Sequence, residues 1–501
     1  MVTGLWAVAL LWIGAGGVGL IYGTRRHRRG AWWLSALVAL LAFFVGGGLG
    51  APARPVGWAF PWQGAGLGGG GPEWVVSAEN WPWFLLALSL PAAALLSVVG
   101  YAAERPHGRI WAGVLALGGV VSLGALAGNP LTLLWVWVLL DGVALTAALI
   151  DSRAEKHSQA VAVAWGRSVG WLGLLGSLFV PASTAAALLT FAVMWRLVWQ
   201  LWDVTADQVQ GALRGSGGLL RRSQILLTLM ALRFWPSGVE GVALGFIGAL
   251  ALVGALVVAF GPPPRAGDGV GMALGAWAVW AAAQGQRDAL VALAALAIMW
   301  GVLADAGAGG GWLTWPAWGV LLASLALLPG SPGGAVRALW LRLGPSARMA
   351  LFGAWLLLGV GVGRHLWRAN RQGRGTALPV GAQGAYLLGL ALPGVAALRW
   401  SLSLRNGGLV GWAWLALALG AGVWFGVRRW RQRWPVASEP GPWRRGSQRA
   451  HQALADTLWS LYRGLQRSIA FITALMEGEG GVLWAMVLLG GLIIWMTRGA
   501  R

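Results

Sequence analysis

The sequence predicts an all-α polytopic membrane protein, and three observations carry that prediction. Of its 501 residues, 57% are hydrophobic and only 11% are charged. Apolar runs of about 18 residues or more recur along the chain, and this is the length that an α-helix needs to cross a bilayer. Most connections between these runs alternate between arginine-rich and charge-poor, as the positive-inside rule predicts for successive crossings. We therefore expect about 14 to 16 transmembrane helices in contact with the lipid bilayer.

The composition excludes several classes of function. The net charge of +21 comes mainly from arginines in short loops between spans, so membrane topology explains it and no nucleic-acid partner is expected. The chain has no cysteine, which excludes disulfides, iron–sulfur ligation and thiol catalysis within it. Its five histidines all lie in polar connections, so we expect no haem, metal or other cofactor. Lys156 is the one lysine.

The spans follow one another with regular alternation. The first run, residues 5–22, resembles a signal peptide but lacks a small-residue cleavage site, so we keep it as a helix. The basic loop at residues 24–30 places the N-terminus outside and this loop in the cytoplasm, in what we expect to be a bacterial inner membrane. The expected spans begin near residues 4, 31, 82, 110, 131, 159, 184, 219, 239, 270, 288, 312, 347, 380, 408 and 481.

Four regions are expected along the chain. Residues 1–70 contain two spans and an outside loop, and residues 71–405 form the transmembrane core. Residues 51–80 are rich in glycine and proline and too long for a simple turn, so a small hairpin against the outer surface is expected. Residues 406–434 form an additional span. Residues 435–501 contain a polar cytoplasmic linker, an amphipathic helix over residues 449–476 and a closing span.

A helix break is predicted within residues 325–340, which read LALLPGSPGGAVRALW. The residues that end the first apolar helix are Pro329, Gly330, Pro332 and Gly333. A broken helix persists in a membrane only where protein or water satisfies its free backbone groups. Arg337 follows the break, and we expect it to face the bundle interior. The alternative is a tight interhelical turn with Arg337 at the interfacial edge.

Charged residues inside apolar runs are the candidate functional residues, because burying them is costly. Asp141 lies in the middle of such a run, and Arg167, Arg196 and Arg337 complete the set. An arginine near a span end, such as Arg233, can instead extend to the interface. Asp141 is too short to do so, and pairing with Arg167 or Arg196 would offset the cost of burial. We find no phosphate loop, catalytic triad or metal cluster.

The order of these features resembles the antiporter-like proton-channel subunits of respiratory complex I. Related folds occur in multisubunit sodium/proton antiporters and membrane-bound hydrogenases. The resemblance covers roughly residues 70–400. LALLPGSPGGAVRAL is similar to the family's L-A-G-L-P-P-T-P-G-F-x-G-K. In this match, Arg337 stands at the position where the family carries a membrane lysine or glutamate. NPLTLLWVWVLLDGVALTAALI is similar to a family helix that bears a glutamate, and Asp141 stands at the position of that glutamate. The resemblance implies two inverted five-helix repeats, each with a broken helix.

The departures from the family pattern concern its central lysines. Where the family has F-A-x-K-x-P-L, Met194 replaces the lysine and Arg196 replaces the proline. Thr228 stands where the family often has a lysine, and Ala294 and Ile298 replace the family's H-x-x-x-K. Arginine stays charged at working pH, so it cannot simply take over a proton relay.

Three functional interpretations remain open. The chain is either an antiporter-like subunit that still moves protons or ions, or a degenerate scaffold that keeps the fold and pumps nothing. In both cases its partners are other membrane subunits of a complex I-like assembly, and it is at most a non-redox subunit of an NADH:quinone oxidoreductase-like translocase. The third interpretation is an unrelated multi-span transporter or lipid-handling enzyme.

Overall fold

The computed structural model divides the chain into two compact units, Met1–Gln432 and Arg433–Arg501. It describes residues 3–22, 29–48, 52, 54–59, 71–97, 108–151, 157–202, 216–236, 244–260, 263–305, 315–325, 327, 331–341, 352–364 and 380–403. The expected span at residues 406–434 and the linker, amphipathic helix and closing span of residues 435–501 lie outside the described residues.

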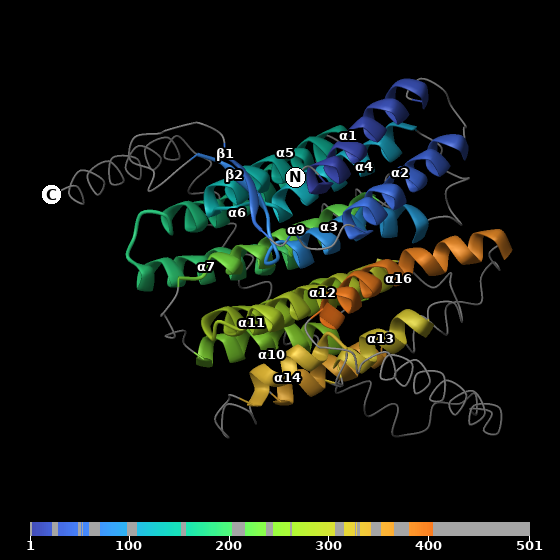
Figure 1. Cartoon of the computed structure of the whole chain (residues 1–501). Helices are drawn as coiled ribbons and strands as arrows, with labels where there is room; N and C mark the ends of the chain where they lie inside the picture. The colour runs from blue at the N-terminus through green and yellow to red at the C-terminus, as the bar shows by residue number, and fades with distance from the viewer. Residues whose placement is uncertain are drawn as a thin grey trace, which may run out of the picture. The chain divides into compact units, whose positions relative to one another are not determined.

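The described part of the first unit is α-helical apart from one small hairpin (Figure 1). Its helices are α1 (Thr3–Tyr22), α2 (Arg29–Gly48), α3 (Trp81–Ser97), α4 (Gly108–Ala125), α5 (Pro130–Asp151), α6 (His157–Gly176), α7 (Ala182–Trp202), α9 (Ser216–Met230), α10 (Leu244–Phe260), α11 (Pro263–Ala283), α12 (Arg287–Asp305), α13 (Trp315–Leu325), α14 (Gly333–Leu341) and α16 (Val380–Ser403). The short 3₁₀ helix η2 (Ala231–Phe234) follows α9, and a further helix spans Phe352–Arg364. Each expected span up to residue 380 has a described helix, or the α13–α14 pair, beginning within two turns of the predicted start.

Many of these helices are apolar enough for a bilayer. Among the described residues, three segments are long and apolar enough to cross it by length and composition alone, namely Gly4–Ile21, Gly30–Gly48 and Ala182–Gln200. Shorter apolar helices account for most of the rest. The all-α fold class is confirmed.

A two-stranded antiparallel sheet covers one end of the bundle. β1 (Val56–Ala59) pairs with β2 (Glu73–Val76), and the indole rings of Trp58 and Trp74 stack on it. The backbone of β2 bonds to the α4–α5 connection through Val75 N to Leu126 O at 2.7 Å. The hairpin predicted for residues 51–80 is therefore present, and it is joined to a helix connection.

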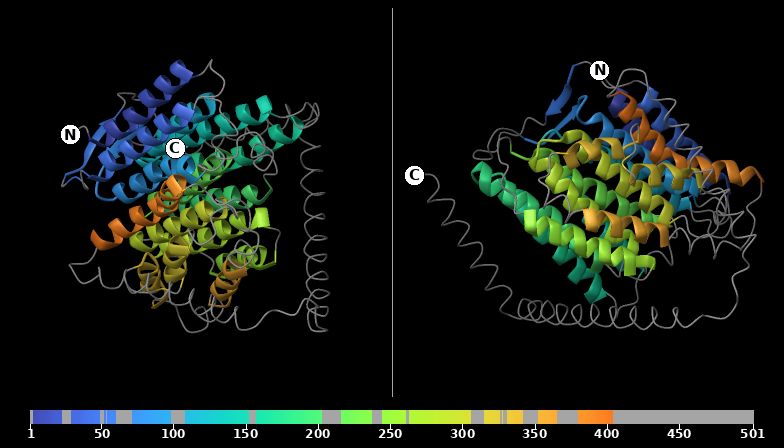
Figure 2. Two further views of the ribbon diagram at one scale, coloured as in Figure 1. Left: turned by 90° about the vertical axis from the view of Figure 1, so that its right-hand side faces the viewer. Right: turned by 90° about the horizontal axis from the view of Figure 1, so that it is seen from below.

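The helices pack in two layers around α9. Figure 1 shows α1, α2, α4, α5 and α6 on one side, and α10, α11, α13 and α14 on the other. α9 contacts α3, α4, α5, α7 and α12, so it lies where the two layers meet. The left-hand view of Figure 2 shows the same succession, with the N-terminal helices at the top and the helices that follow α9 below them. α16, at the end of the described residues, packs against α3.

The predicted helix break is present between α13 and α14. α13 ends at Leu325 and α14 begins at Gly333, and Leu327 between them has a φ of 56°. A side chain at Gly333 would collide with the carbonyl of Ser324, so glycine lets the two segments approach. The indole of Trp355 donates to the Leu325 carbonyl at 2.7 Å and so satisfies a group at the end of α13. A neighbouring helix thus supplies the partner that a broken membrane helix needs.

The second break that the family resemblance implies is absent. α7 is one continuous α-helix from Ala182 to Trp202. The proline that would interrupt it is replaced by Arg196, whose backbone N–H can join the helix. The expectation that each repeat contains a broken helix is therefore wrong for the first one.

Candidate functional site

Asp141 lies in the middle of α5 and is only 2% exposed. Trp137 precedes it by one helical turn and is fully buried. Residues four apart share a helix face, so α5 presents a carboxylate and an indole side by side to the bundle interior. The indole N–H of Trp137 donates to the Leu227 carbonyl of α9 at 3.1 Å, which ties this face of α5 to α9.

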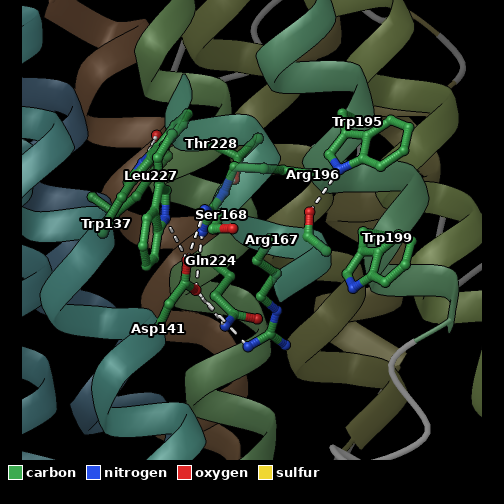
Figure 3. Close-up of polar contacts among 12 residues, drawn as sticks. Trp137, Asp141, Arg167, Ser168, Trp195, Arg196, Trp199, Gln224, Leu227 and Thr228 are labelled. Carbon is green, nitrogen blue, oxygen red and sulfur yellow. Dashed lines mark hydrogen bonds and ion pairs between the residues drawn. The ribbon is translucent and has the colours of Figure 1, made fainter. Parts of the chain in front are cut away.

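Arg196 of α7 binds both oxygens of Asp141 (Figure 3). Its Nη1 is 2.7 Å from Oδ2 and its Nη2 is 3.1 Å from Oδ1. The guanidinium also lies over the ring of Trp137, at 4.3 Å from the centroid. Bidentate pairing and stacking are the geometries in which arginine differs most from lysine. The pair is therefore specific for an arginine at this position.

Two further helices complete the shell of donors around Asp141. From α6, Trp171 Nε1 donates to Oδ2 at 2.8 Å, and Arg167 Nη1 lies 3.8 Å from Oδ1. From α9, Gln224 Nε2 is 3.4 Å from Oδ1, and the Thr228 hydroxyl accepts from Arg196 Nε at 3.4 Å. Each oxygen of the carboxylate thus has at least two donors, which approaches the capacity of an ionised carboxylate. This arrangement favours the ionised form and leaves little room for a proton.

Packing between α6 and α7 holds Arg196 in position. A side chain at Gly170 would collide with the Arg196 stem, so this glycine makes room for it. On the neighbouring turns of α7, Trp195 donates to the Gly166 carbonyl at 2.6 Å and Trp199 to the Val163 carbonyl at 3.0 Å. These two indole bonds hold α7 against α6. In Figure 3, Trp195 and Trp199 lie on one side of the charged residues.

The structure separates Arg337 from the other sequence-predicted residues. It brings together Asp141, Arg167 and Arg196, but Arg337 on α14 is exposed. The expectation that Arg337 faces the bundle interior is therefore wrong for this chain. The reason is that Val336, Leu339 and Trp340 occupy the buried face of α14.

Arg233 is half-buried and lies at the hairpin end of the bundle. Its guanidinium bonds the Asn80 side chain at 2.6 Å and the carbonyls of Ala125 and Ala127 at the end of α4. A cation there compensates the free carbonyls at a helix C-terminus.

Sequence reasoning missed Arg222 and Gln224. Both are buried on α9, and the Arg222 stem packs against Gly301 of α12. The arginines of the run GALRGSGGLLRRS, residues 211–223, are typical of a basic loop, although a span is predicted to begin near residue 219. α9 begins at Ser216 and includes Arg221 and Arg222. The spacing of Gln224 and Thr228, one turn apart in an apolar run, is the signal that could have indicated a polar helix face.

Comparisons with known proteins agree on the fold. No protein-family model and no curated protein sequence matches the chain. Among solved structures, a chain of the membrane-bound sulfane sulfur reductase, an archaeal respiratory membrane complex, aligns with a TM-score of 0.65 and 12% identity over 97% of this chain and 99% of that one. A chain of respiratory complex I from Thermus thermophilus gives 0.61 and 17%, over 83% and 99%. A chain of the Mrp complex from Dietzia sp. DQ12-45-1b gives 0.55 and 15%, over all of this chain and 63% of that one.

At these identities the likeness concerns the fold alone. It agrees with the many apolar helices among the described residues. The chain is an all-α polytopic membrane protein, and it shares its fold with chains of these three membrane complexes.

Proposed function

We propose that this chain is an antiporter-like subunit of a complex I-like membrane assembly, and that it acts as a scaffold that does not pump. Its likeness over nearly full-length chains of respiratory complexes supports the first part. The same likeness speaks against an unrelated transporter or lipid-handling enzyme.

The observation that carries the scaffold role is the locked state of Asp141. A proton relay needs groups that gain and lose protons, and the neighbours of Asp141 include two arginines, which stay charged. To accept a proton, Asp141 would have to release a bidentate arginine from a buried site. Met194 and Thr228 are buried at positions where the family has lysines. Neither of these two side chains can exchange a proton with Asp141. The competing path through Asp141, Arg196 and Arg337 is interrupted because Arg337 is exposed.

Proton movement in liposomes tests the scaffold role without an electron donor. The purified chain is reconstituted with a pH-sensitive dye inside, and a potassium diffusion potential is imposed. We expect the wild type and the Asp141→Asn/Arg196→Met double variant to show the same background proton flux. A flux that is present in the wild type and lost in Asp141→Asn, at equal folded amount, would show that the chain conducts protons.

Assembly in the native membrane gives the complementary measurement. As a scaffold, the chain should migrate with other membrane subunits on native gels. Asp141→Asn should reduce this assembly, because it leaves buried arginines uncompensated, and the double variant should restore much of it. A single variant that assembles normally while the assembly stops pumping would contradict the proposal.

The orientation is proposed as well, with the N-terminus outside a bacterial inner membrane. The hairpin end of the bundle holds the start of α3 and the end of α4, joined by Arg233, and the start of α12, where Arg287 pairs with Glu79. This grouping agrees with helices that alternate in direction. Because the chain lacks cysteine, single cysteines at Gly30 and Gly57 test it. An impermeant maleimide added outside should label position 57 and not position 30, and the reverse pattern would refute the orientation.

A further inference from the structure

Arg337 is an exposed charge on an otherwise apolar part of the surface. Among the described residues, no hydrogen bond or ion pair to its side chain is present. It lies four residues into α14, just after the helix break. The neighbouring helix Phe352–Arg364 packs on α14 through ring contacts of Trp340 with Phe352 and Trp355. On its outer side Phe352, Leu356 and Val360 are exposed at four-residue spacing, which forms an apolar stripe.

The depth of Arg337 follows from its neighbours. Trp340 stacks on Trp277 of α11 with ring centroids 5.1 Å apart. α11 ends at Ala283, next to the turn whose Arg287 pairs with Glu79, so this end of α11 marks the hairpin face. At 1.5 Å per residue, Trp277 lies about 9 Å below that end of α11. Trp340 lies at the same level as Trp277, and Arg337 precedes Trp340 by three residues on α14, so Arg337 is about 4–5 Å deeper. Arg337 is thus near the middle of a hydrocarbon core about 30 Å thick.

A charge at this depth needs a partner. Lipid phosphates lie at the membrane surfaces, farther away than an arginine side chain extends from this level. An arginine that faces hydrocarbon is costly, and such residues are found paired or turned toward protein. A carboxylate on a helix of another membrane subunit fits both the charge and the depth.

We propose that α14 and the helix Phe352–Arg364 form a docking face for a second membrane subunit, which places a carboxylate of an apolar helix against Arg337. The apolar stripe packs against that helix, and the ion pair fixes its depth and register. This inference rests on the proposed function, because it requires the chain to be part of an assembly.

Photo-crosslinking in native membranes tests this face. A photoreactive amino acid replaces Leu356, and comparison probes replace Trp165 of α6 and Leu20 of α1, which lie elsewhere and are more exposed than Leu356. We expect the probe at position 356 to capture one membrane subunit, identified by mass spectrometry. Arg337→Glu should lower this crosslink at least about tenfold, as loss of a buried interfacial ion pair does. In the Arg337→Glu variant, replacing the partner's carboxylate residue by lysine should restore the crosslink. As a control, Arg54→Glu on the hairpin should leave the crosslink unchanged.

A second variant keeps the test decisive if Arg337→Glu does not fold. Arg337→Leu suits either lipid or an apolar interface, so the chain should fold and the crosslink should still fall. An unchanged crosslink in Arg337→Leu would overturn the ion pair. Labelling of lipid alone at position 356, with a subunit captured at 165 or 20, would overturn the docking face and leave the proposed function standing. Labelling of lipid alone at all three positions, with the chain migrating by itself, would overturn both.

Discussion

Two successive groups of helices in this chain share an architecture and differ in what they bury. The first group consists of α4, α5, α6, α7 and α9. The second group consists of α10, α11, α12, the α13–α14 pair and the helix Phe352–Arg364. Five crossings are an odd number, so the second group starts on the opposite side of the membrane from the first. This order fits the inverted repeats that the sequence resemblance implies.

The same contact closes each group. At the end of the first, Arg233 donates to the carbonyls of Ala125 and Ala127 at the end of α4. At the end of the second, Arg364 donates to the carbonyl of Ala259 at the end of α10. In each group, an arginine at the end of the fifth element thus caps the C-terminus of the first helix.

The interiors of the two groups differ in polarity. All buried charged side chains among the described residues, Asp141, Arg167, Arg196 and Arg222, belong to the first group. The corresponding interior of the second group holds Trp277, Trp340 and Trp355 in mutual ring contact, with Ala294 and Ile298 fully buried nearby on α12. The helix break lies in the second group, and the buried charges lie in the first. A broken helix and a buried charge are therefore separable features of this fold.

The largest effect is expected when a charge is placed in the second group. Ile298→Lys would place a lysine where the family that the sequence resembles carries one, but at a fully buried position among apolar side chains. An unpaired buried ion costs several kcal/mol, and overpacking adds about 1–3 kcal/mol. We expect the variant not to accumulate as folded protein in membranes, whereas Ile298→Met should accumulate normally. Normal thermal stability of Ile298→Lys would show that the second group can host a relay residue.

The second effect concerns the charges of the first group. Asp141→Asn leaves Arg196 and Arg167 without their carboxylate, which should lower the free energy of unfolding by about 3–5 kcal/mol. Thermal unfolding of the purified protein in detergent measures this change. Adding Arg196→Met should recover a large part of it. Equal stability of Asp141→Asn and wild type would mean that the carboxylate is not what balances the arginines.

The arginine caps should respond alike in the two groups. Arg233→Met and Arg364→Met each remove a charged donor from helix carbonyls, at about 1.5–3 kcal/mol. Arg233→Met should be the more harmful, because it also leaves the buried Asn80 side chain without this bond. The two variants are compared by thermal unfolding, with Arg54→Met on the exposed hairpin as the control. An effect of only one variant would break the parallel between the groups.

The smallest effect is expected for a single donor to Asp141. Trp171→Phe keeps an aromatic ring, though a smaller one, and removes the indole N–H that donates to Oδ2 at 2.8 Å. Since Arg196 still holds that oxygen, the loss should be about 1–2 kcal/mol, well below that of Asp141→Asn. The same unfolding assay checks it. A loss as large as that of Asp141→Asn would show that Trp171, rather than the arginines, holds the carboxylate.

Hydropathy was sufficient to locate the helices, because each span must satisfy its own backbone in lipid. The pairing of Asp141 with an arginine followed from the cost of a lone buried charge. The sequence could not choose between Arg167 and Arg196, and both contact Asp141 in the structure. It overlooked Arg222 as a buried residue because the start of α9 is rich in glycine and arginine, a composition typical of a loop. The outward direction of Arg337 depends on which side of α14 its neighbours cover, and no local pattern encodes that. The functional roles of all these residues stay predictions.

The paired arginine caps bear on how the chain is made. Arg233 follows every helix of its group in the sequence, so its contact with the end of α4 forms only when α9 has been synthesised. From that moment the first group is closed by its own residues, before α10 has been added. Arg364 does the same for the second group, one hundred and thirty-one residues later by its numbering. Each arginine contact therefore forms only when its group has been fully synthesised. A nascent chain can thus fold the first group before the helices of the second group have been made.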